Sequence, residues 1–360
     1  MQFQSIRSQQ TTSNLIVGAG LAGCTLARRL EQAGQSFQLI GSSRLPAAFQ
    51  VAAGIINPVT GRWMTKSWRF DDFAHEAARF YRAIEGDFSI EAYHPIPEVR
   101  FCLHADDTKR ARRRIRNPRY AKVLGDYTPP GESHPTIRNP HGSFTILGAA
   151  YVELHQVVGA LRRHYAGQGK LRDASFDYGK LSPGADVWIY EGLAYERVIF
   201  CEGASLKQNP WFGHLPITPA KGETLLCNCP ELELPQQLLH HQKWLLPYPN
   251  GQFRMGATYD ESDLSEAPTE AGAKELLDGF HALTADPHEA EVIRHLAGIR
   301  PSTHDARPFL GQHPDCPGLY IFNGLGSKGA SLAPGLSREL LEYILEGKAL
   351  DREADIQRFT

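Results

Sequence analysis

The chain has 360 residues, of which 42% are hydrophobic and 22% charged, the balance of a globular protein with a sizeable core. Its 38 Lys and Arg against 40 Asp and Glu give a net charge of −2, which excludes a general electrostatic attraction to nucleic acid or to membranes. Any such partner needs a local basic patch. No apolar run approaches the roughly 18 to 20 residues of a spanning helix, and the first residues contain no apolar leader region. We therefore expect a cytoplasmic protein.

The N-terminal segment has the pattern strand, glycine turn, helix, strand. An apolar run over residues 14–18 leads into the sequence GAGLAG, and apolar residues then recur at helical spacing as far as Ala33. Gly34 ends this helix, and Phe37–Ile40 forms a second strand, parallel to the first because a helix separates them. This is the first half of a dinucleotide-binding unit.

Each glycine of the turn has its own physical role. The first permits the tight turn, the second lets the backbone approach a pyrophosphate, and the third lets helix and strand pack closely. The helix N-terminus adds unpaired N–H groups and positive potential. The predicted pyrophosphate site comprises Gly18, Ala19, Gly20, Leu21, Ala22 and Gly23.

The end of the second strand departs from the usual pattern. An acidic residue is expected about 20 positions after the glycines, where it binds a ribose hydroxyl, but this strand ends in Gly41-Ser42-Ser43-Arg44. We predict that Ser42 and Ser43 bind the ribose and that Arg44 binds a phosphate or the adenine. At this point both NADP and FAD remain open.

Two later segments repeat the strand and glycine-turn pattern. Tyr195–Ser205 is predicted to be a buried strand ending in a glycine turn, with a helix over residues 151–165 before it. Gly318–Gly329 places a strand ahead of a glycine-rich turn, and an apolar helix follows from about Ala330 to Gly347.

The six cysteines are scattered, which fits a reducing compartment rather than a disulfide framework. Cys227 and Cys229 form the one close pair. Without a second ligand pair it lacks the spacing of a zinc site, so we interpret both as strand residues and predict no metal.

The C-terminal block resembles the closing signature of FAD-dependent amine oxidoreductases of the D-amino acid oxidase and glycine oxidase superfamily. It reads GIRPSTHDARPFLG over residues 298–311 and GLYIFNGLGSKGASLAPG over residues 318–335. AAGIINP (52–58) is similar to the family's flavin-side loop, and VIFCEGA (198–204) to its strand that ends in a glycine turn. Together these motifs span nearly the whole chain in order.

The resemblance implies an α/β fold with a Rossmann-like FAD-binding domain and an inserted, mostly antiparallel β-sheet substrate domain. Strand-like segments such as EVRFCLH, PITPAKGETLLCN and KWLLPYPNGQFRMGATYD, with a hairpin turn at Asn250-Gly251, fit the inserted sheet. We assign residues 1–88, 145–206 and 294–360 to the FAD-binding domain. Residues 89–144 and 207–293 form the predicted substrate domain.

The resemblance also implies the cofactor contacts. A reduced flavin gains negative charge near its C2 carbonyl, and the helix that begins at about Ala330 points its positive end there, with Lys328 adding a full charge. No cysteine stands in the closing signature as far as Phe309, so we expect FAD to be bound noncovalently. Besides the N-terminal turn, the implied FAD-binding residues are Ala53, Gly54, Ile55, Gly203, Gly326, Ser327, Lys328 and Gly329.

Arg300 matches the position at which members that oxidise amino acids bind the substrate carboxylate. A guanidinium suits this role because it donates two parallel hydrogen bonds to a carboxylate, although an internal salt bridge would also explain it. Trp244 and Tyr259 fall near pocket-lining positions of the family, and ordinary sheet packing is the alternative for both.

The resemblance implies oxidation of the CH–NH bond of a small amino acid or N-substituted amino acid. The flavin accepts a hydride from the carbon next to a neutral amine, so the protein supplies orientation and electrostatics, here from Arg300 and Lys328, rather than an acid–base pair. A flavin-binding protein without this activity and a nicotinamide-dependent enzyme are the alternatives.

The segment Lys109–Lys122 contains eight basic residues and no acidic one. Such a run can follow phosphates. The ending GSKGASLAP is also similar to that of the flavin domain of the bacterial bifunctional enzyme that trims carboxymethylaminomethyl-uridine in tRNA, which implies tRNA as a possible partner and an N-substituted glycine as the group oxidised. A solvent-exposed helix of the inserted domain is the alternative.

Overall fold

The computed structural model describes residues 12–43, 47–249 and 251–359. Its contacts divide the chain into two compact units. The first comprises Met1–Phe49, Leu154–Pro219 and Arg300–Thr360. The second comprises Gln50–Glu153 and Ala220–Ile299.

The first unit is built on an eight-stranded sheet with a parallel centre. The parallel pairs join β10 (Leu171–Arg172), β2 (Phe37–Ile40), β1 (Thr12–Val17), β13 (Leu193–Phe200) and β20 (Leu319–Asn323) in that order. The antiparallel strands are β11 (Leu181–Pro183), β12 (Trp188–Tyr190) and β19 (Phe309–Gln312). The central strands are buried on both faces, which explains their nearly continuous apolar sequences.

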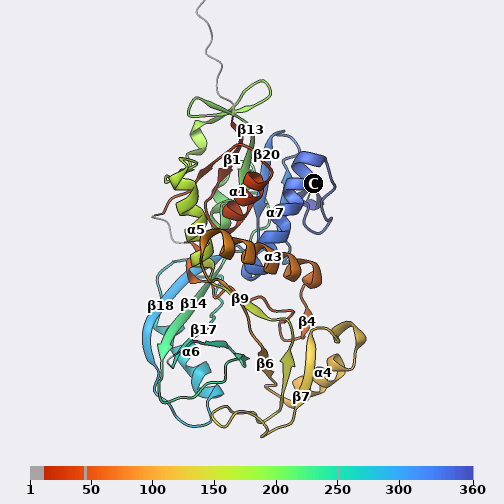
Figure 1. The fold of residues 1–360 in the computed structure, drawn as a ribbon, viewed down its shortest axis with the longest axis vertical. Coiled ribbons are helices and arrows are strands. Elements are labelled where there is room, and N and C mark those ends of the chain that lie inside the picture. The colour runs from red at the N-terminus through yellow and green to blue at the C-terminus, as the bar shows by residue number, and fades with distance from the viewer. Residues whose placement is uncertain (1–11, 44–46, 250, 360) are drawn as a thin grey trace, which may run out of the picture. The chain divides into compact units, whose positions relative to one another are not determined.

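Three long helices accompany this sheet (Figure 1). α1 (Leu21–Gln32) contacts both α5 (Leu154–Gly167) and α7 (Gly329–Glu346). Short 3-10 turns lie at Tyr178–Lys180, Gly203–Gln208, Gly326–Lys328 and Ile356–Phe359. Aromatic side chains contribute to the core of this unit, with Phe200, Phe212 and Phe309 completely buried.

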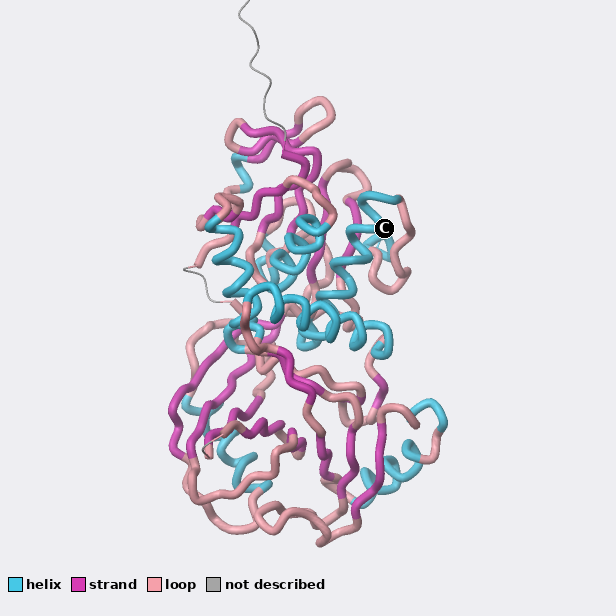
Figure 2. Tube along the Cα trace, in the orientation of Figure 1, coloured by secondary structure: helices cyan, strands magenta, loops and turns pink. Residues whose placement is uncertain are grey.

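The second unit is dominated by another eight-stranded sheet, most of whose pairs are antiparallel. Figure 2 draws the strands in magenta. Its order is β18 (Glu291–Arg300), β14 (Ala220–Asn228), β17 (Gln252–Gly256), β16 (Trp244–Pro247), β15 (Leu238–His240), β6 (Glu98–Phe101), β8 (Ser143–Ile146) and β7 (Leu124–Thr128). α6 (Glu270–Leu283) packs on β14 and β17, burying Phe280 against Phe253. Other elements are α2 (Ala48–Val51), β3 (Val59–Thr60), β4 (Thr65–Lys66), α3 (Phe70–Phe88), β5 (Tyr93–Pro95), α4 (Ala105–Ile115), a 3-10 turn (Pro118–Tyr120) and β9 (Ala150–Val152).

The α/β fold with an inserted antiparallel sheet is confirmed, but two expectations differ from the structure. The helix predicted over residues 151–165 begins only at Leu154, because Ala150–Val152 pairs with β5. The compact units divide the chain at other boundaries than the predicted domains: residues 207–219 fall in the first unit, and residues 50–88, 145–153 and 294–299 fall in the second. There the Glu85 carboxylate at the end of α3 accepts hydrogen bonds from the backbone of Ala92 and Tyr93.

Cys227 lies in β14 as predicted, whereas Cys229 lies just beyond the end of this strand; both are buried. The described residues contain no cluster of three or more side chains suited to hold a metal ion. Within the same residues, no helix has the length and apolar character needed to cross a bilayer.

Candidate active site

The outer glycines of the N-terminal turn are required by close backbone contacts. Gly18 has φ +106°, and its N–H donates to the carbonyl of Ile40 at 2.8 Å. A Cβ on Gly18 would lie 2.3 Å from the carbonyl oxygen of Cys201, and a Cβ on Gly23 would lie 1.8 Å from that of Gly18. No side chain fits at either position.

Gly20 is different, because a Cβ there would meet nothing within 4 Å. Gly20 is also the N-cap of α1, and no side chain caps this helix or places an acid in its first turn. Open space in front of an uncapped helix N-terminus is what a pyrophosphate needs. The geometry of Gly18–Gly23 therefore fits a dinucleotide.

Arg162 on α5 holds this turn, a role that sequence reasoning missed. Its guanidinium donates to the carbonyl of Ala19 at 3.1 Å and to that of Gly41 at 3.2 Å. Arg162 lies more than a hundred residues from both Ala19 and Gly41 in the sequence, so no local pattern identifies it.

The segment that follows β2 is hydrogen-bonded to Asp173, which follows β10. Ser43 donates its backbone N–H to Asp173 Oδ1 at 2.6 Å and its hydroxyl to Asp173 Oδ2. Ser42 is half-buried between Gly41 and Ser43, and the predicted phosphate ligand Arg44 lies outside the described residues.

Gly203, after β13, also faces open space. It has φ +59°, no atom lies within 4 Å of a Cβ built there, and its carbonyl accepts from Asn323 Nδ2 at 3.1 Å. The preceding Glu202 accepts hydrogen bonds from Tyr178 and Asn209, the latter at 2.7 Å. Burial raises the pKa of Glu202 to about 7.

The structure brings the Arg300 loop and the closing glycine turn together within the first unit. Gly326 donates its N–H to the carbonyl of Pro301 at 3.0 Å, and Thr218 donates to that of Ser302 at 2.8 Å. A Cβ on Gly326 would come no closer than 3.8 Å to Ser302, so space remains beside this turn. Arg300 itself is the last residue of β18 and is half-buried.

Lys328 is the N-cap of α7, which starts at Gly329 without a side-chain cap. Burial, helped by the nearby charge of Arg307, lowers the pKa of the Lys328 ammonium. Ser327, which directly precedes Lys328, is exposed. A partly desolvated cation at a helix N-terminus makes this turn attractive to negative charge.

Asp305, next to the Arg300 loop, anchors the loop. Its carboxylate accepts from the backbone N–H of Arg307 and from Arg358 Nε, both at 3.0 Å. These bonds, together with the Arg358 charge, hold the pKa of Asp305 below its usual range against the opposing effect of burial. His304 is exposed, and its backbone donates to Pro216 at 3.1 Å.

In the second unit, the loop 52–56 that includes Ala53, Gly54 and Ile55 is fixed by β9. Gly54 has φ +66°, and a Cβ on it would lie 1.9 Å from the carbonyl oxygen of Val152. The Val152 N–H donates back to Gly54 at 3.1 Å, and Ile56 pairs with Ala150. Only glycine fits at Gly54.

Arg254 on β17 holds the same loop from another direction and is a second residue that sequence reasoning missed. Its guanidinium donates to the carbonyl of Val51, to that of Ala52 at 3.3 Å and to Thr224 Oγ1 at 3.4 Å. Burial lowers the pKa of Arg254. The motif RMGATYD contained this residue, but nothing in the motif indicated what the guanidinium binds.

Trp244 and Tyr259 occupy different environments in the second unit. Trp244 pairs with Gly256 across β16 and β17, and a Cβ on that glycine would lie 2.5 Å from the indole ring. The Trp244 indole thus packs against the sheet at Gly256. Tyr259, by contrast, is 60% exposed on the segment that follows β17. The turn residue Asn250 of the predicted hairpin lies outside the described residues.

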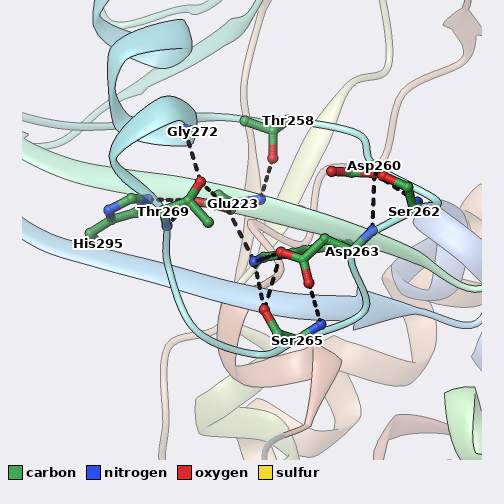
Figure 3. A network of polar contacts seen from close by, with 10 residues as sticks. Glu223, Thr258, Asp260, Ser262, Asp263, Ser265, Thr269, Gly272 and His295 are labelled. Carbon is green, nitrogen blue, oxygen red and sulfur yellow. Dashed lines mark hydrogen bonds and ion pairs between the residues drawn. The ribbon is translucent and has the colours of Figure 1, made fainter.

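A polar network anchors the segment that carries Tyr259 (Figure 3). The buried Lys221 ammonium donates to Asp263 at 2.6 Å and to Ser265 at 3.1 Å. Glu223 accepts from the backbone and hydroxyl of Thr269 at 3.0 and 2.9 Å and lies 2.7 Å from His295 Nε2. This network holds the segment on both sides of Asp263.

The basic segment Lys109–Lys122 comprises most of α4 and the turn after it. The guanidinium of Arg110 lies 4.9 Å from the ring of Trp63, and that of Arg62 lies 4.8 Å from it. Trp63 is nevertheless 56% exposed. Lys109, Arg113 and Arg116 project from one exposed side of the helix, opposite the buried Ala111, because they are spaced four and three residues apart.

Comparison with known proteins gives a family and a fold. The profile of a family described as "FAD dependent oxidoreductase" matches residues 14–343. Glycine oxidase of Pseudomonas aeruginosa is 25% identical over 93% of this chain and 94% of its own. The tRNA 5-methylaminomethyl-2-thiouridine biosynthesis bifunctional protein of Marinobacter nauticus is 26% identical over 93% of this chain and 56% of its own.

Solved structures agree on the fold. Glycine oxidase from Geobacillus kaustophilus superposes with a TM-score of 0.81 at 19% identity, covering 94% of this chain and 96% of the other. Iminodiacetate oxidase from Chelativorans sp. BNC1 gives 0.78 at 22% identity, covering 95% and 98%.

Proposed function

The chain belongs to the family of FAD-dependent oxidoreductases, and from that premise we propose that it oxidises the CH–NH bond of a small amino acid or N-substituted amino acid. The observation that carries the proposal is the position of Arg300. Its loop is hydrogen-bonded through Pro301 to Gly326, in the glycine turn that precedes α7. A guanidinium there suits a substrate carboxylate, since it offers two parallel donors. Glycine and iminodiacetate, for which two relatives are named, both carry an amine beside a carboxymethyl group.

The open glycine positions fit FAD. Gly18–Gly23 would hold its pyrophosphate on the N-terminus of α1, and Gly326–Gly329 the pyrimidine end of the flavin. Ala53–Ile55 of the second unit is the third proposed flavin segment. When bound, FAD supplies the acceptor for the hydride that leaves the substrate carbon. The positive end of α7 and Lys328 would stabilise the negative charge that a reduced flavin gains near its C2 carbonyl.

The substrate amine must be neutral to react. In this proposal Arg300 orients the carboxylate, which places the adjacent C–H bond without any acid–base pair of side chains. The positive charges of Arg300 and Lys328 disfavour an ammonium ion beside them. Water then hydrolyses the imine product.

Anaerobic mixing of the purified holoprotein with a panel of amino acids and N-alkyl glycines tests this function. We expect at least one member to bleach the visible absorption of the flavin. The corresponding amides, such as glycinamide, should fail because they cannot pair with Arg300 as an anion. Absence of bleaching by every member would reject the proposal, and equal bleaching by the amides would reject the role of Arg300.

The basic surface of the second unit favours a second candidate, in which the oxidised N-substituted glycine is part of a tRNA. This surface comprises Lys109–Lys122 with Arg62 and Trp63. Its exposed, outward-facing cations Lys109, Arg113 and Arg116 suit phosphates. The similarity to the tRNA-modifying protein of Marinobacter nauticus also supports this candidate.

Titration of labelled tRNA from low to moderate salt tests the second candidate. Replacing Arg113, Arg116 and Lys122 together by Gln should weaken binding and lower the slope of log affinity against log salt by about 2 to 3. Lys274→Gln, an exposed lysine on α6 of the same unit, is the matched control and should change nothing. Weak binding that does not depend on salt would eliminate the tRNA candidate.

A further inference from the structure

Residues 301–308 form the loop that joins Arg300 to β19 in the first unit. Near its start, the carbonyl of Pro301 is bound by the closing glycine turn. Further along, the hydroxyl of Thr303 donates to the carbonyl of Arg307 at 2.7 Å, across the turn between them. This hydrogen bond joins the two halves of the loop, so the position of the second half bears on that of the first.

The second half of the loop is not held by burial, because residues 304–306 are all exposed. Ala306 also has φ +56°, a left-handed conformation that is uncommon for a residue with a side chain. Such a conformation persists where specific contacts around it stabilise it. The contacts made by the residues beside Ala306 therefore decide how well the loop is ordered.

Arg358, in the 3-10 turn after α7, binds this half of the loop. Its Nε donates to Asp305 Oδ2 at 3.0 Å. Its Nη2 donates to the carbonyl of Pro308 at 3.0 Å and to that of Arg307 at 3.4 Å. The remaining nitrogen, Nη1, donates to the carbonyl of Asp355 at 2.9 Å, which orients the guanidinium from its own turn.

The surroundings of Arg358 restrict its guanidinium further. The side chain is only 16% exposed, and the guanidinium lies 5.4 Å from the ring of Phe309 and 4.3 Å from that of Phe359. The backbone of β19 is bound to the same segment, since the Leu310 N–H donates to the carbonyl of Ala354 at 2.9 Å. A planar guanidinium with bonds from all three nitrogens and two aromatic neighbours has little freedom to move.

We propose that Arg358 is a positioning residue for Arg300. It fixes the second half of the loop and, through the hydrogen bond across the loop, the first half, so that the Arg300 guanidinium meets a substrate carboxylate with its donors aligned. A bidentate pair needs this alignment, because both hydrogen bonds weaken when either plane turns. The inference rests on the proposed function, in which Arg300 binds the carboxylate. Arg358 itself acts only through the loop.

Stopped-flow reduction of the flavin in the holoprotein tests the proposal, with glycine, N-methylglycine and iminodiacetate as substrates. Arg358→Met should lower kcat/KM about 5- to 50-fold, mainly by raising KM, which is less than the roughly 100-fold that a misplacement of about 1 Å can cost. Arg358→Lys keeps the charge and one donor group and should recover part of the loss. Arg352→Met, at an exposed arginine of the same segment, is the matched control and should match wild type.

A double variant separates positioning from a general structural role. If Arg358 acts through Arg300, then Arg358→Met should cost less than about twofold more in an Arg300→Met background, whereas independent losses multiply. Asp305→Asn removes the charged partner of Arg358 but keeps its shape, and should lower kcat/KM about 2- to 5-fold. This variant decides the matter if Arg358→Met does not fold.

Three results would contradict these expectations. An unchanged kcat/KM in Arg358→Met, or in Asp305→Asn where that variant decides, would overturn the positioning role. A loss in the Arg300→Met background as large as the loss in wild type would overturn it as well, because Arg358 would then act independently of Arg300. A wild-type holoprotein whose flavin no member of the amino-acid panel reduces would instead overturn the proposed function, and this inference with it.

Discussion

The glycine turn of the first unit and the loop 52–56 of the second unit are both tight backbone segments, but they are secured differently. Gly23 is required because its neighbour Gly18, five residues earlier, leaves no room for a side chain. The loop 52–56 is held by Arg254 and by β9, about one hundred to two hundred residues away along the chain. A geometry enforced by near neighbours leaves a pattern in the sequence, whereas one enforced by a distant side chain does not.

Substitutions at Gly23 and Gly20 should have two distinct effects, one on the stability of the turn and one on FAD binding. Gly23→Ala places a methyl group against backbone that cannot move away, so we expect a loss of about 3 to 5 kcal/mol in the free energy of unfolding of the apoprotein. Gly20→Ala meets open space and should keep its stability but bind FAD more weakly. Urea unfolding and FAD titration measure the two effects. Equal stability of Gly23→Ala and wild type would refute the packing argument.

Arg300 tests whether a charge, rather than backbone shape, decides substrate binding in the first unit. Arg300→Met should lower kcat/KM for a carboxylate substrate about 100- to 1,000-fold through the loss of a charged hydrogen-bonded pair. Arg300→Lys should recover part of this loss, because it keeps the charge without the bidentate geometry. Stopped-flow reduction of the flavin at varied substrate concentration gives both values. An unchanged kcat/KM in Arg300→Met would show that the carboxylate binds elsewhere.

Glu202 tests how far a buried charge affects the first unit. Because folding raises its pKa to about 7, the folded protein favours the neutral acid. The stability that the neutral Glu202 contributes is fully present below the pKa that this side chain has in the unfolded chain, and it is lost as the pH rises through 7. Glu202→Gln should resemble wild type at pH 5 and exceed its free energy of unfolding by about 3 kcal/mol at pH 9. Chemical denaturation at both pH values measures the difference, and a pH-independent gap would contradict the assignment.

Arg254 is the corresponding test in the second unit. Arg254→Met removes the donors to Val51 and Ala52, and we expect a loss of about 2 kcal/mol in the free energy of unfolding. Arg113→Met on α4, an exposed arginine of the same unit, should have an effect within about 0.5 kcal/mol. Similar losses in the two variants would mean that Arg254 does not hold the loop.

The sequence alone was sufficient for the strand, turn and helix around Gly18–Gly23, the strand before Gly326 and the stop of α7 at Gly347, where φ is +69°. These features depend on residues close together in the chain, since hydrogen-bond geometry and glycine φ angles act locally. The family resemblance, which rests on the same local motifs, and the FAD cofactor it implied are confirmed.

Tertiary structure decided which side chains serve those motifs. Arg162, Arg254 and Asp173 reach their partners only because strands and helices distant in sequence pack side by side. It also assigned Tyr151 and Val152 to β9 rather than to a helix, since pairing with β5 outweighs the local helical pattern. Pairing between strands far apart in the chain depends on the register of whole sheets, and a single segment carries no record of it.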